Sequence, residues 1–336
     1  MLRVPFNEMV TILESALKKK NFATEDAHLG ATLFAKNSLD GVHTHGLNRF
    51  PRVLEYCDKG LIVPDAKMER IAVIGALEQW DAHLGLGPLT ARRSMDRAME
   101  LAKEHGVGCV AQRNSNHWMR GGAYGWQAVE AGYAAICWTN TQPNMPAWGA
   151  KDRRLGNNPL VLAVPRSAGH IVIDAAMSQF SYGKIEEYRL KGAQLPVPGG
   201  FDKNGALTVV PEDIEETWRV LPMGFWKGAG FSLVLDLFAA TLSGGFTTSE
   251  IGGLGGDEYS LSQVFIAFDP YRFESRETID ARLDHAIEDL HGSLQEKANT
   301  RAAYPGERVL NTRKENLALG IPVVESIWKQ IVTFAK

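Results

Sequence analysis

Strand-type and helix-type segments follow one another irregularly through the middle of this chain, and this pattern most limits how it can fold. The strand candidates are short and rich in β-branched residues, and they are Ile71–Ile74, Val107–Val110, Ala134–Thr139, Leu160–Val164, Ile171–Asp174 and Val264–Phe268. A doubly wound parallel sheet has a helix between successive strands, and the sequence lacks that regular rhythm. The pattern therefore predicts an α+β fold built around one sheet.

Helical periodicity dominates both ends of the chain. Apolar residues recur at three- and four-residue spacing from Phe6 to Leu17, and Thr24 before two acids predicts the N-cap of a second helix. Further helices are expected over 47–59, 89–104, 231–242, 279–294 and 316–336, and from Gly122 onward. The segment 231–242 is apolar on nearly every side, which is typical of a buried helix. We expect residues 1–70 and 280–336 to form one helical module and residues 71–279 to form the sheet-containing domain.

Composition excludes several classes of partner. The chain has 336 residues, 45% apolar and 22% charged, which suits a globular protein of about two domains. A net charge of −3 gives no broad attraction for nucleic acid or anionic membrane. No apolar run reaches the ~20 residues that span a bilayer, and the first residues lack the order of a secretory signal. Three scattered cysteines suit a reducing compartment, so we expect a soluble cytoplasmic enzyme.

One stretch, GVHTHGLNRF (41–50), concentrates groups that suit acid–base chemistry beside an acidic substrate. Imidazole titrates near neutral pH, and a guanidinium grips a carboxylate with two hydrogen bonds. His45 lies four residues before Arg49, which would place a proton carrier near a carboxylate clamp. The alternative interpretation is a helix start with a capping Thr44 and ordinary surface charges.

The common cofactor and metal signatures are incomplete in this sequence. Gly85-Leu-Gly87 is followed by Pro88, and the third glycine of a standard dinucleotide-binding turn is missing. His43, His45 and His117 could contribute to a metal site, but no acidic cluster accompanies them. We therefore expect neither a standard Rossmann site nor a bound metal.

Several loops after candidate strands are rich in polar groups. The stretch RNSNHWMRGG (113–122) precedes a helix and offers Asn116 and His117, although a polar helix cap is an equally good interpretation. Asp174 ends a strand and either accepts ribose hydroxyls or only starts a turn. Trp226 and Lys227 combine a stacking surface with a cation that suits phosphate, whereas a solvated lysine is the usual alternative.

Taken together, these stretches resemble the malate/L-lactate dehydrogenase family, whose members are NAD(P)-dependent reductases without a Rossmann fold. The resemblance covers essentially the whole chain and is carried by GVHTHGLNRFPR (41–52), GALEQWDA (75–82), RNSNHWMRGGAYGWQA (113–128), WTNTQPNMPAWGA (138–150), LGNNPL (155–160), FSYGK (180–184), LPMGFWKGAGFSLVLD (221–236) and DEYSLSQVFIA (257–267). Thr44 replaces an expected serine and keeps its hydroxyl. His43 replaces a tyrosine or serine and is not expected to be the catalytic imidazole.

The resemblance implies a role for each matching position. His45 would be the proton donor, and Thr44, Arg49 and His117 would line the substrate site, with Asn116 as a partner for substrate hydroxyls. The cofactor would be held by His170, Ile171, Val172, Ile173, Asp174, Ala175 and Ala176, by Trp226 and Lys227, and by Gly306, Glu307 and Arg308. The family also implies a homodimer and a largely antiparallel sheet in the NAD-binding domain.

These roles define the expected reaction as NADH-dependent reduction of a 2-oxo acid, with NADPH left open. Within the family, a sugar-derived acid is the favoured substrate, and malate, lactate, ureidoglycolate or a cyclic imino acid are the alternatives. A catalytically silent small-molecule binding protein is the alternative from another class. The presence of His45, Arg49 and Lys227 together argues against it.

Overall fold

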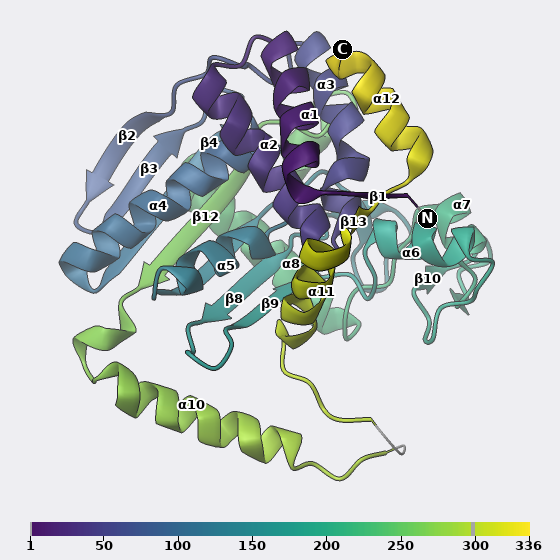
Figure 1. The fold of residues 1–336 in the computed structure, drawn as a ribbon. Coiled ribbons are helices and arrows are strands. Elements are labelled where there is room, and N and C mark those ends of the chain that lie inside the picture. Colours follow the sequence, from purple (N-terminus) through teal and green to yellow (C-terminus); the bar gives the residue numbers. More distant parts are fainter. Residues whose placement is uncertain (1, 297–299) are drawn as a thin grey trace.

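The computed structural model describes residues 2–296 and 300–336, and a seven-stranded sheet lies at its centre (Figure 1). Its strands, in order across the sheet, are β2 (Glu69–Ile74), β3 (Leu77–Asp81), β4 (Val107–Ser115), β12 (Leu261–Phe268), β5 (Ala134–Thr139), β8 (Leu160–Val164) and β9 (Ile171–Ala175). Only β3 and β4 run parallel, and all other neighbours are antiparallel. The predicted α+β class with a largely antiparallel sheet is confirmed.

Strand β3 was not among the predicted strands because its sequence is polar. Glu78 lies inside this strand and is buried, which would be costly for an unpaired carboxylate. It accepts hydrogen bonds from Arg97 Nη2 (2.8 Å) and Trp80 Nε1 (2.9 Å). These partners offset the loss of water, and they are not visible from the alternation of apolar residues.

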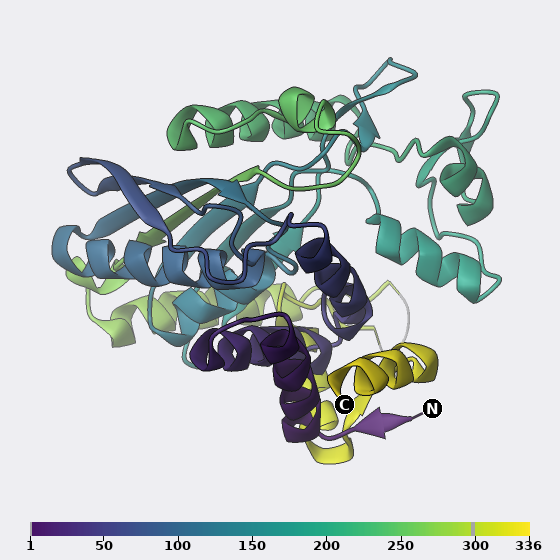
Figure 2. The same ribbon diagram turned by 90° about the horizontal axis from the view of Figure 1, so that it is seen from above.

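Helices cover both faces of the sheet, as Figure 2 shows. Helices α4 (Gly87–His105) and α5 (Gly122–Glu130) pack on one face, and α8 (Trp226–Ser243) packs on the other. The core on the α4–α5 side is built around Trp118, Tyr124 and Phe265, whose rings contact one another at centroid distances of 5.6 to 5.9 Å. The sheet domain is therefore a three-layer arrangement.

The prediction that the segment 231–242 is buried on all sides is wrong in this chain. Small side chains such as Ser232 and Ala239 face the sheet, whereas Phe231 and Phe238 are 56% and 55% exposed. We call the exposed set the α8 apolar face, and it comprises Phe231, Leu233, Val234, Leu237 and Phe238. Leu162 and Val164 of β8 and Ile173 of β9 are exposed as well. An apolar helix thus covers the sheet with its small residues and presents its large ones to the outside.

The N-terminal helices and the last helix share one apolar core. Its helices are α1 (Phe6–Lys19), α2 (Thr24–Leu39), α3 (Phe50–Asp58) and α12 (Glu325–Ala335). Strand β1 (Arg3–Val4) pairs antiparallel with β13 (Ile321–Pro322), and Ser15 Oγ donates to the Ala335 carbonyl at 2.9 Å. The helix expected from Thr24 does begin there, but Thr24 is its first residue and makes no capping hydrogen bond.

The helix expected over 316–336 is interrupted. Helix α11 (Glu307–Leu319) ends at Gly320, which adopts a φ of +83° that a residue with a side chain rarely takes. Pro322 follows in β13 and cannot continue a helix. Glycine and proline therefore separate α11 from α12.

Helix α10 (Arg276–His291) projects beside the sheet, away from the terminal helices (Figure 1). Its contacts with the loop after β8 include Arg166 Nε to Asp284 Oδ1 at 2.6 Å and Ser167 N to Asp280 Oδ1 at 3.2 Å. Ile287 is its buried residue. The division into 1–70 with 280–336 and 71–279 stays a prediction.

Residues between β9 and α8 form a small lobe with its own apolar cluster. The lobe contains α6 (Tyr182–Leu190), β10 (Gly200–Phe201), β11 (Leu207–Thr208) and α7 (Pro211–Thr217). The remaining short elements are η1 (His43–His45), η2 (Leu47–Arg49), β6 (Met145–Pro146), β7 (Arg153–Leu155), α9 (Thr248–Gly252) and η3 (Pro270–Arg272). In the described ranges, no helix combines the length and apolarity needed to cross a membrane.

Candidate active site

A cavity of about 1440 Å³ opens where the terminal helices, the strand-end loops and the small lobe meet. Thr44, His45 and Arg49 line it from η1 and η2, and His117 lines it from the loop after β4. The structure therefore brings together four of the five residues predicted to handle the substrate. His43 and Asn116 do not line this cavity.

Close packing against α2 positions the turn that carries His45 and Arg49. A Cβ on Gly46 would lie 2.2 Å from Ser38 Oγ and 2.8 Å from Ser38 N, so the turn approaches α2 too closely for a larger residue. Ser38 Oγ accepts the Leu47 N–H at 2.8 Å, and Asn37 Nδ2 donates to the His45 carbonyl at 3.0 Å. These bonds hold the backbone on both sides of Gly46.

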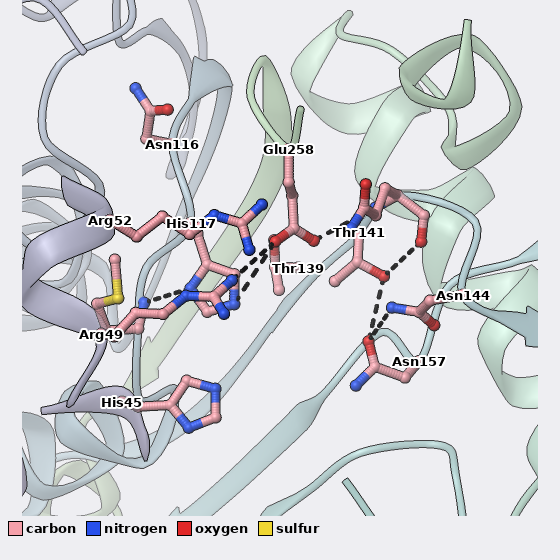
Figure 3. Close-up of polar contacts among 12 residues, drawn as sticks. His45, Arg49, Arg52, Asn116, His117, Thr139, Thr141, Asn144, Asn157 and Glu258 are labelled. Atoms are coloured by element: carbon pink, nitrogen blue, oxygen red, sulfur yellow. Dashed lines mark hydrogen bonds and ion pairs between the residues drawn. The ribbon is translucent and has the colours of Figure 1, made fainter. Parts of the chain in front are cut away.

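The two imidazoles lie face to face. The ring centroids of His45 and His117 are 5.5 Å apart with an interplanar angle of 11° (Figure 3). His117 Nδ1 accepts the Met119 N–H at 2.9 Å, so the neutral ring carries its proton on Nε2. Thr44 Oγ1 lies 3.3 Å from His45 Nδ1 and orients the other ring. Each imidazole thus keeps one nitrogen for contact with a bound molecule.

Burial keeps both rings neutral at pH 7. Burial, helped by the nearby His117 and Arg49 and opposed by Glu258, lowers the pKa of His45 to about 3. Burial is also the main cause that lowers the pKa of His117 to about 3, with Arg49 and Arg52 contributing. In the protein without substrate, the site therefore holds two neutral imidazoles whose protonation is disfavoured.

Glu258 completes the site, although the sequence did not single it out. Its side chain is 7% exposed, and its Oε2 lies 3.8 Å from Arg49 Nη2 and 4.0 Å from His117 Nε2. Its Oε1 accepts the Gln142 N–H at 3.4 Å, and its own N–H donates to Tyr56 Oη at 3.1 Å. The only signal in the sequence is an acid between a glycine-rich loop and a strand, which does not reveal that the loop reaches Arg49.

Uncharged polar groups form another wall of the cavity (Figure 3). Thr141 Oγ1 donates to Asn157 Oδ1 at 3.3 Å, and Asn144 Nδ2 donates to the same oxygen at 2.9 Å. Asn144 and Asn157 both line the cavity. Amide groups of this kind donate and accept hydrogen bonds without adding charge.

Asn116 does not line this cavity but lines a small pocket beside it, next to Arg49 and His117, and its expected contact with substrate hydroxyls stays a prediction. Its Nδ2 donates to three backbone carbonyls, those of Leu61 (2.9 Å), Leu84 (2.9 Å) and Gly85 (3.1 Å). Its own carbonyl accepts a bond from Gln263 Nε2 at 2.9 Å. The side-chain nitrogen and the backbone carbonyl of Asn116 are therefore both hydrogen-bonded within the protein. These bonds fix the loop that carries His117.

The segments predicted to hold the cofactor each contact the chain around β9, at separate points, and none of them lines the cavity. The Val172 N–H donates to the Pro305 carbonyl at 2.9 Å, which places His170–Ala176 next to Gly306–Arg308. Met177 O accepts the Met223 N–H at 2.8 Å, which brings the start of α8, with Trp226 and Lys227, to the end of β9. The chain then continues through Ser181–Gly183, which do line the cavity.

The side chain of Asp174 already has a partner inside the protein. Its Oδ2 accepts the Gly122 N–H at 2.7 Å, at the start of α5. Burial raises the pKa of this carboxyl, and the bond from the Gly122 N–H opposes that shift. The contact is neither of the two roles considered for Asp174, and both stay predictions.

Comparison with known proteins identifies the family of this chain. A family model described as malate/L-lactate dehydrogenase matches residues 4–332. The chain belongs to the malate/L-lactate dehydrogenase family. It is 46% identical over 330 residues to 2,3-diketo-L-gulonate reductase of Klebsiella pneumoniae, covering 98% of this chain and 99% of that protein. As a member of this family it is an oxidoreductase, and the family indicates a nicotinamide cofactor.

Solved structures of the malate/L-lactate dehydrogenase family share the fold. Sulfolactate dehydrogenase from Methanocaldococcus jannaschii superposes with a TM-score of 0.91 at 27% identity, covering 99% of this chain and 96% of that one. Malate dehydrogenase from Pyrococcus horikoshii gives a TM-score of 0.89 at 28% identity, covering 99% and 94%. The names of these relatives span several 2-hydroxy or 2-oxo acids, so the fold alone leaves the substrate open.

Proposed function

We propose that this chain catalyses the NADH-dependent reduction of 2,3-diketo-L-gulonate to 3-keto-L-gulonate. The observation that carries the proposal is the meeting of His45, His117 and Arg49 in one cavity. The substrate is suggested by the 46% identity, over 98% of the chain, to proteins named 2,3-diketo-L-gulonate reductase. The uncharged polar wall of the cavity suits the hydroxyl groups of such an acid.

Arg49 would hold the substrate carboxylate. Its guanidinium is partly exposed to the cavity and has Glu258 at 3.8 Å, a separation longer than a direct hydrogen bond. A bound carboxylate can therefore take the two parallel N–H groups that arginine offers. Gripping the carboxylate fixes the neighbouring 2-oxo carbon close to the imidazoles, and such positioning supplies several kcal/mol of the barrier.

His45 would donate the proton to the oxygen of the reduced carbonyl. The ring is neutral in the protein without substrate, so it must gain a proton when the substrate binds. The negative charge of the substrate favours the charged imidazolium and raises the pKa of the ring in the complex. One general acid contributes about 10²–10⁴-fold to a rate.

His117 is the second candidate for the proton donor because it is stacked on His45 and keeps its Nε2 proton toward the cavity. In the arrangement that we favour, His117 contacts the substrate and His45 donates the proton. The alternative exchanges these two tasks. Variants of each histidine separate the two arrangements, as described in the Discussion.

The residues beside β9 would hold the dinucleotide. The N-terminal amides of α11, at Gly306–Arg308, suit a pyrophosphate, and the exposed ring of Trp226 with the Lys227 ammonium suits an aromatic base or a phosphate. Backbone groups of His170–Ala176 would provide the remaining contacts. When bound, the nicotinamide supplies the hydride for the reaction. NADPH remains the alternative to NADH.

The α8 apolar face supports a homodimer, which we propose as the working form. Monomeric proteins rarely expose a patch of this size and composition. A two-fold interface buries the same patch on both copies, and large apolar side chains at its centre are typical of permanent dimers. The composition supports a cytoplasmic location, as expected from the sequence.

A substrate panel tests the proposed reaction directly. NADH oxidation is followed by absorbance with 2,3-diketo-L-gulonate, oxaloacetate, pyruvate and a cyclic imino acid, and NAD⁺ reduction is followed with ureidoglycolate. We expect the highest kcat/KM with 2,3-diketo-L-gulonate. A higher value with another member of the panel would replace the proposed substrate. No turnover with any of them would favour the silent binding protein.

A further inference from the structure

Glu258 lines the cavity, and its carboxylate lies at the end where the two imidazoles meet. Its side chain is 7% exposed and lies 3.8 Å from Arg49 and 4.0 Å from His117. Arg52 also lines this part of the cavity and donates to Tyr56 Oη at 2.8 Å. The same tyrosine oxygen accepts the Glu258 N–H at 3.1 Å, so Glu258 and Arg52 are held by a shared group.

The charges at this end of the cavity sum to a single positive charge. Arg49 and Arg52 each contribute one positive charge, and Glu258 contributes one negative charge. His45 and His117 add none at pH 7 because burial keeps both rings neutral. This sum applies to the protein without substrate; a second carboxylate bound at this end would lie beside the negative charge of Glu258.

We propose that Glu258 restricts this site to 2-oxo acids with one carboxylate and a hydroxylated chain, and excludes dicarboxylates. The inference rests on the proposed function and names the class of acid that it accepts. A carboxylate in the cavity wall accepts hydrogen bonds from hydroxyl groups and repels a second carboxylate. Sites built to pair a substrate hydroxyl discriminate strongly against molecules that lack it.

The uncharged polar part of the lining fits the same class of acid. Asn144 and Asn157 line the cavity and offer amide groups without charge. Farther along the lining, Arg154 pairs with Asp152 at 2.6 Å and Arg189 pairs with Glu215 at 2.5 Å. Lys151, Arg153 and Arg219 add cations around β7 and the end of α7. The groups beside the imidazoles therefore suit hydrogen bonds with substrate hydroxyls. Glu258 is the charged group that disfavours a second carboxylate.

Glu258→Gln tests the inference because it removes the charge and keeps the shape. Binding of L-lactate, L-malate and L-gulonate is measured by calorimetry without nucleotide, so that no turnover is needed. Lactate and malate differ by one carboxylate, and gulonate adds the hydroxylated chain. In the native protein we expect lactate to bind about tenfold more tightly than malate, and gulonate more tightly than lactate. In Glu258→Gln, malate should gain about tenfold relative to lactate, and gulonate should lose its advantage.

Two further variants separate selection from a structural role. Asp257→Asn removes a neighbouring negative charge that faces Lys59 at 3.2 Å, and it should leave all three affinities unchanged. Glu258→Asp keeps the charge on a shorter side chain, so it should still bind lactate more tightly than malate. This variant provides the test if Glu258→Gln does not fold. If Glu258 only neutralises Arg49, Glu258→Gln changes lactate and malate equally, and that result overturns the inference. Absent NADH oxidation by the native protein would instead overturn the proposed reaction, while the affinity ratios still decide the role of Glu258.

Discussion

At the scale of single residues, the surroundings of His45 change what its type alone suggests. A histidine free in water titrates near ~6.5, so its residue type alone suggests an imidazole that is partly charged near neutral pH. The structure places His45 against His117 and Arg49 and lowers its pKa to about 3. His45 could be identified from the sequence, but its burial could not be predicted, because the segments that bury it are far away in the chain.

This lowered pKa predicts a pH dependence. The charged ring is the active acid for reduction, and the kcat/KM profile reports the pKa of the protein without substrate. Because that pKa is about 3, the charged fraction is small throughout pH 5–8. The value of kcat/KM for reduction should therefore fall about tenfold for each pH unit across this window, whereas oxidation, which uses the neutral ring, should stay flat.

The controls for this pH profile are variants of the two histidines. His45→Gln should lose at least ~100-fold in kcat, still bind NADH and show no slope. His117→Gln should be weaker in substrate binding but keep the slope. A plateau in kcat/KM below pH 6.5 would show that burial does not set the pKa of His45. A pH slope that is lost only in His117→Gln would make His117 the proton donor and His45 the substrate contact.

Arg49→Lys should weaken substrate binding more than it slows the bound complex. Lysine keeps the charge but lacks the planar fork that holds a carboxylate with two hydrogen bonds. We expect KM for the 2-oxo acid to rise by about tenfold or more, with a smaller change in kcat, in steady-state NADH oxidation. An unchanged KM would show that another group holds the carboxylate.

At the scale of elements, the turn between η1 and η2 depends on Gly46. A Cβ at this position would meet Ser38 Oγ at 2.2 Å and the Phe34 carbonyl at 3.1 Å, so Gly46→Ala must move the turn or α2. We expect a loss of about 1–3 kcal/mol in the free energy of unfolding. A displacement of ~1 Å at His45 would also reduce kcat by up to ~100-fold.

Thermal unfolding and steady-state kinetics on the same samples measure both effects of Gly46→Ala. Gly292→Ala is the matched control because the added Cβ meets nothing closer than 3.3 Å and the φ of Gly292 is −74°. It should leave kcat and unfolding close to native. If Gly46→Ala keeps the native kcat and the native free energy of unfolding, α2 moves to admit the added methyl group without loss of stability.

The elements also show where sequence patterns reach their limit. The turn at 41–50 was singled out from residue types that lie close together in the sequence, and the structure places Thr44, His45 and Arg49 in one cavity. Strand β3 and the residue Glu258 were missed because their polar groups are satisfied by distant partners, Arg97 and Arg49. The backbone contacts of Asn116 could not be predicted either, because a side chain after a strand can turn toward the backbone as easily as toward a ligand.

At the scale of the whole molecule, the α8 apolar face predicts self-association. The native protein should sediment as a dimer at micromolar concentration, since the exposed rings of Phe231 and Phe238 lie seven residues apart on one helix side. Phe231→Glu with Phe238→Glu would bury unpaired charges at the contact and should weaken the dimer by at least ~100-fold.

Analytical ultracentrifugation measures this equilibrium. Val324→Glu is the control, because Val324 is another exposed apolar residue and precedes α12. It should remain dimeric. A native protein that stays monomeric, or a double variant with unchanged association, would show that α8 meets no second copy.

The shared core of α1, α2, α3 and α12 has a consequence for synthesis of the protein on the ribosome. The first helices emerge early, but α12 packs against them and follows only after roughly 270 more residues. At the usual rate of translation this interval is on the order of 15–50 s, during which the apolar surface that α12 later covers stays open. The sheet domain has time to form in between. Chaperone protection of the early helices is therefore needed most while the rest of the chain is still being made.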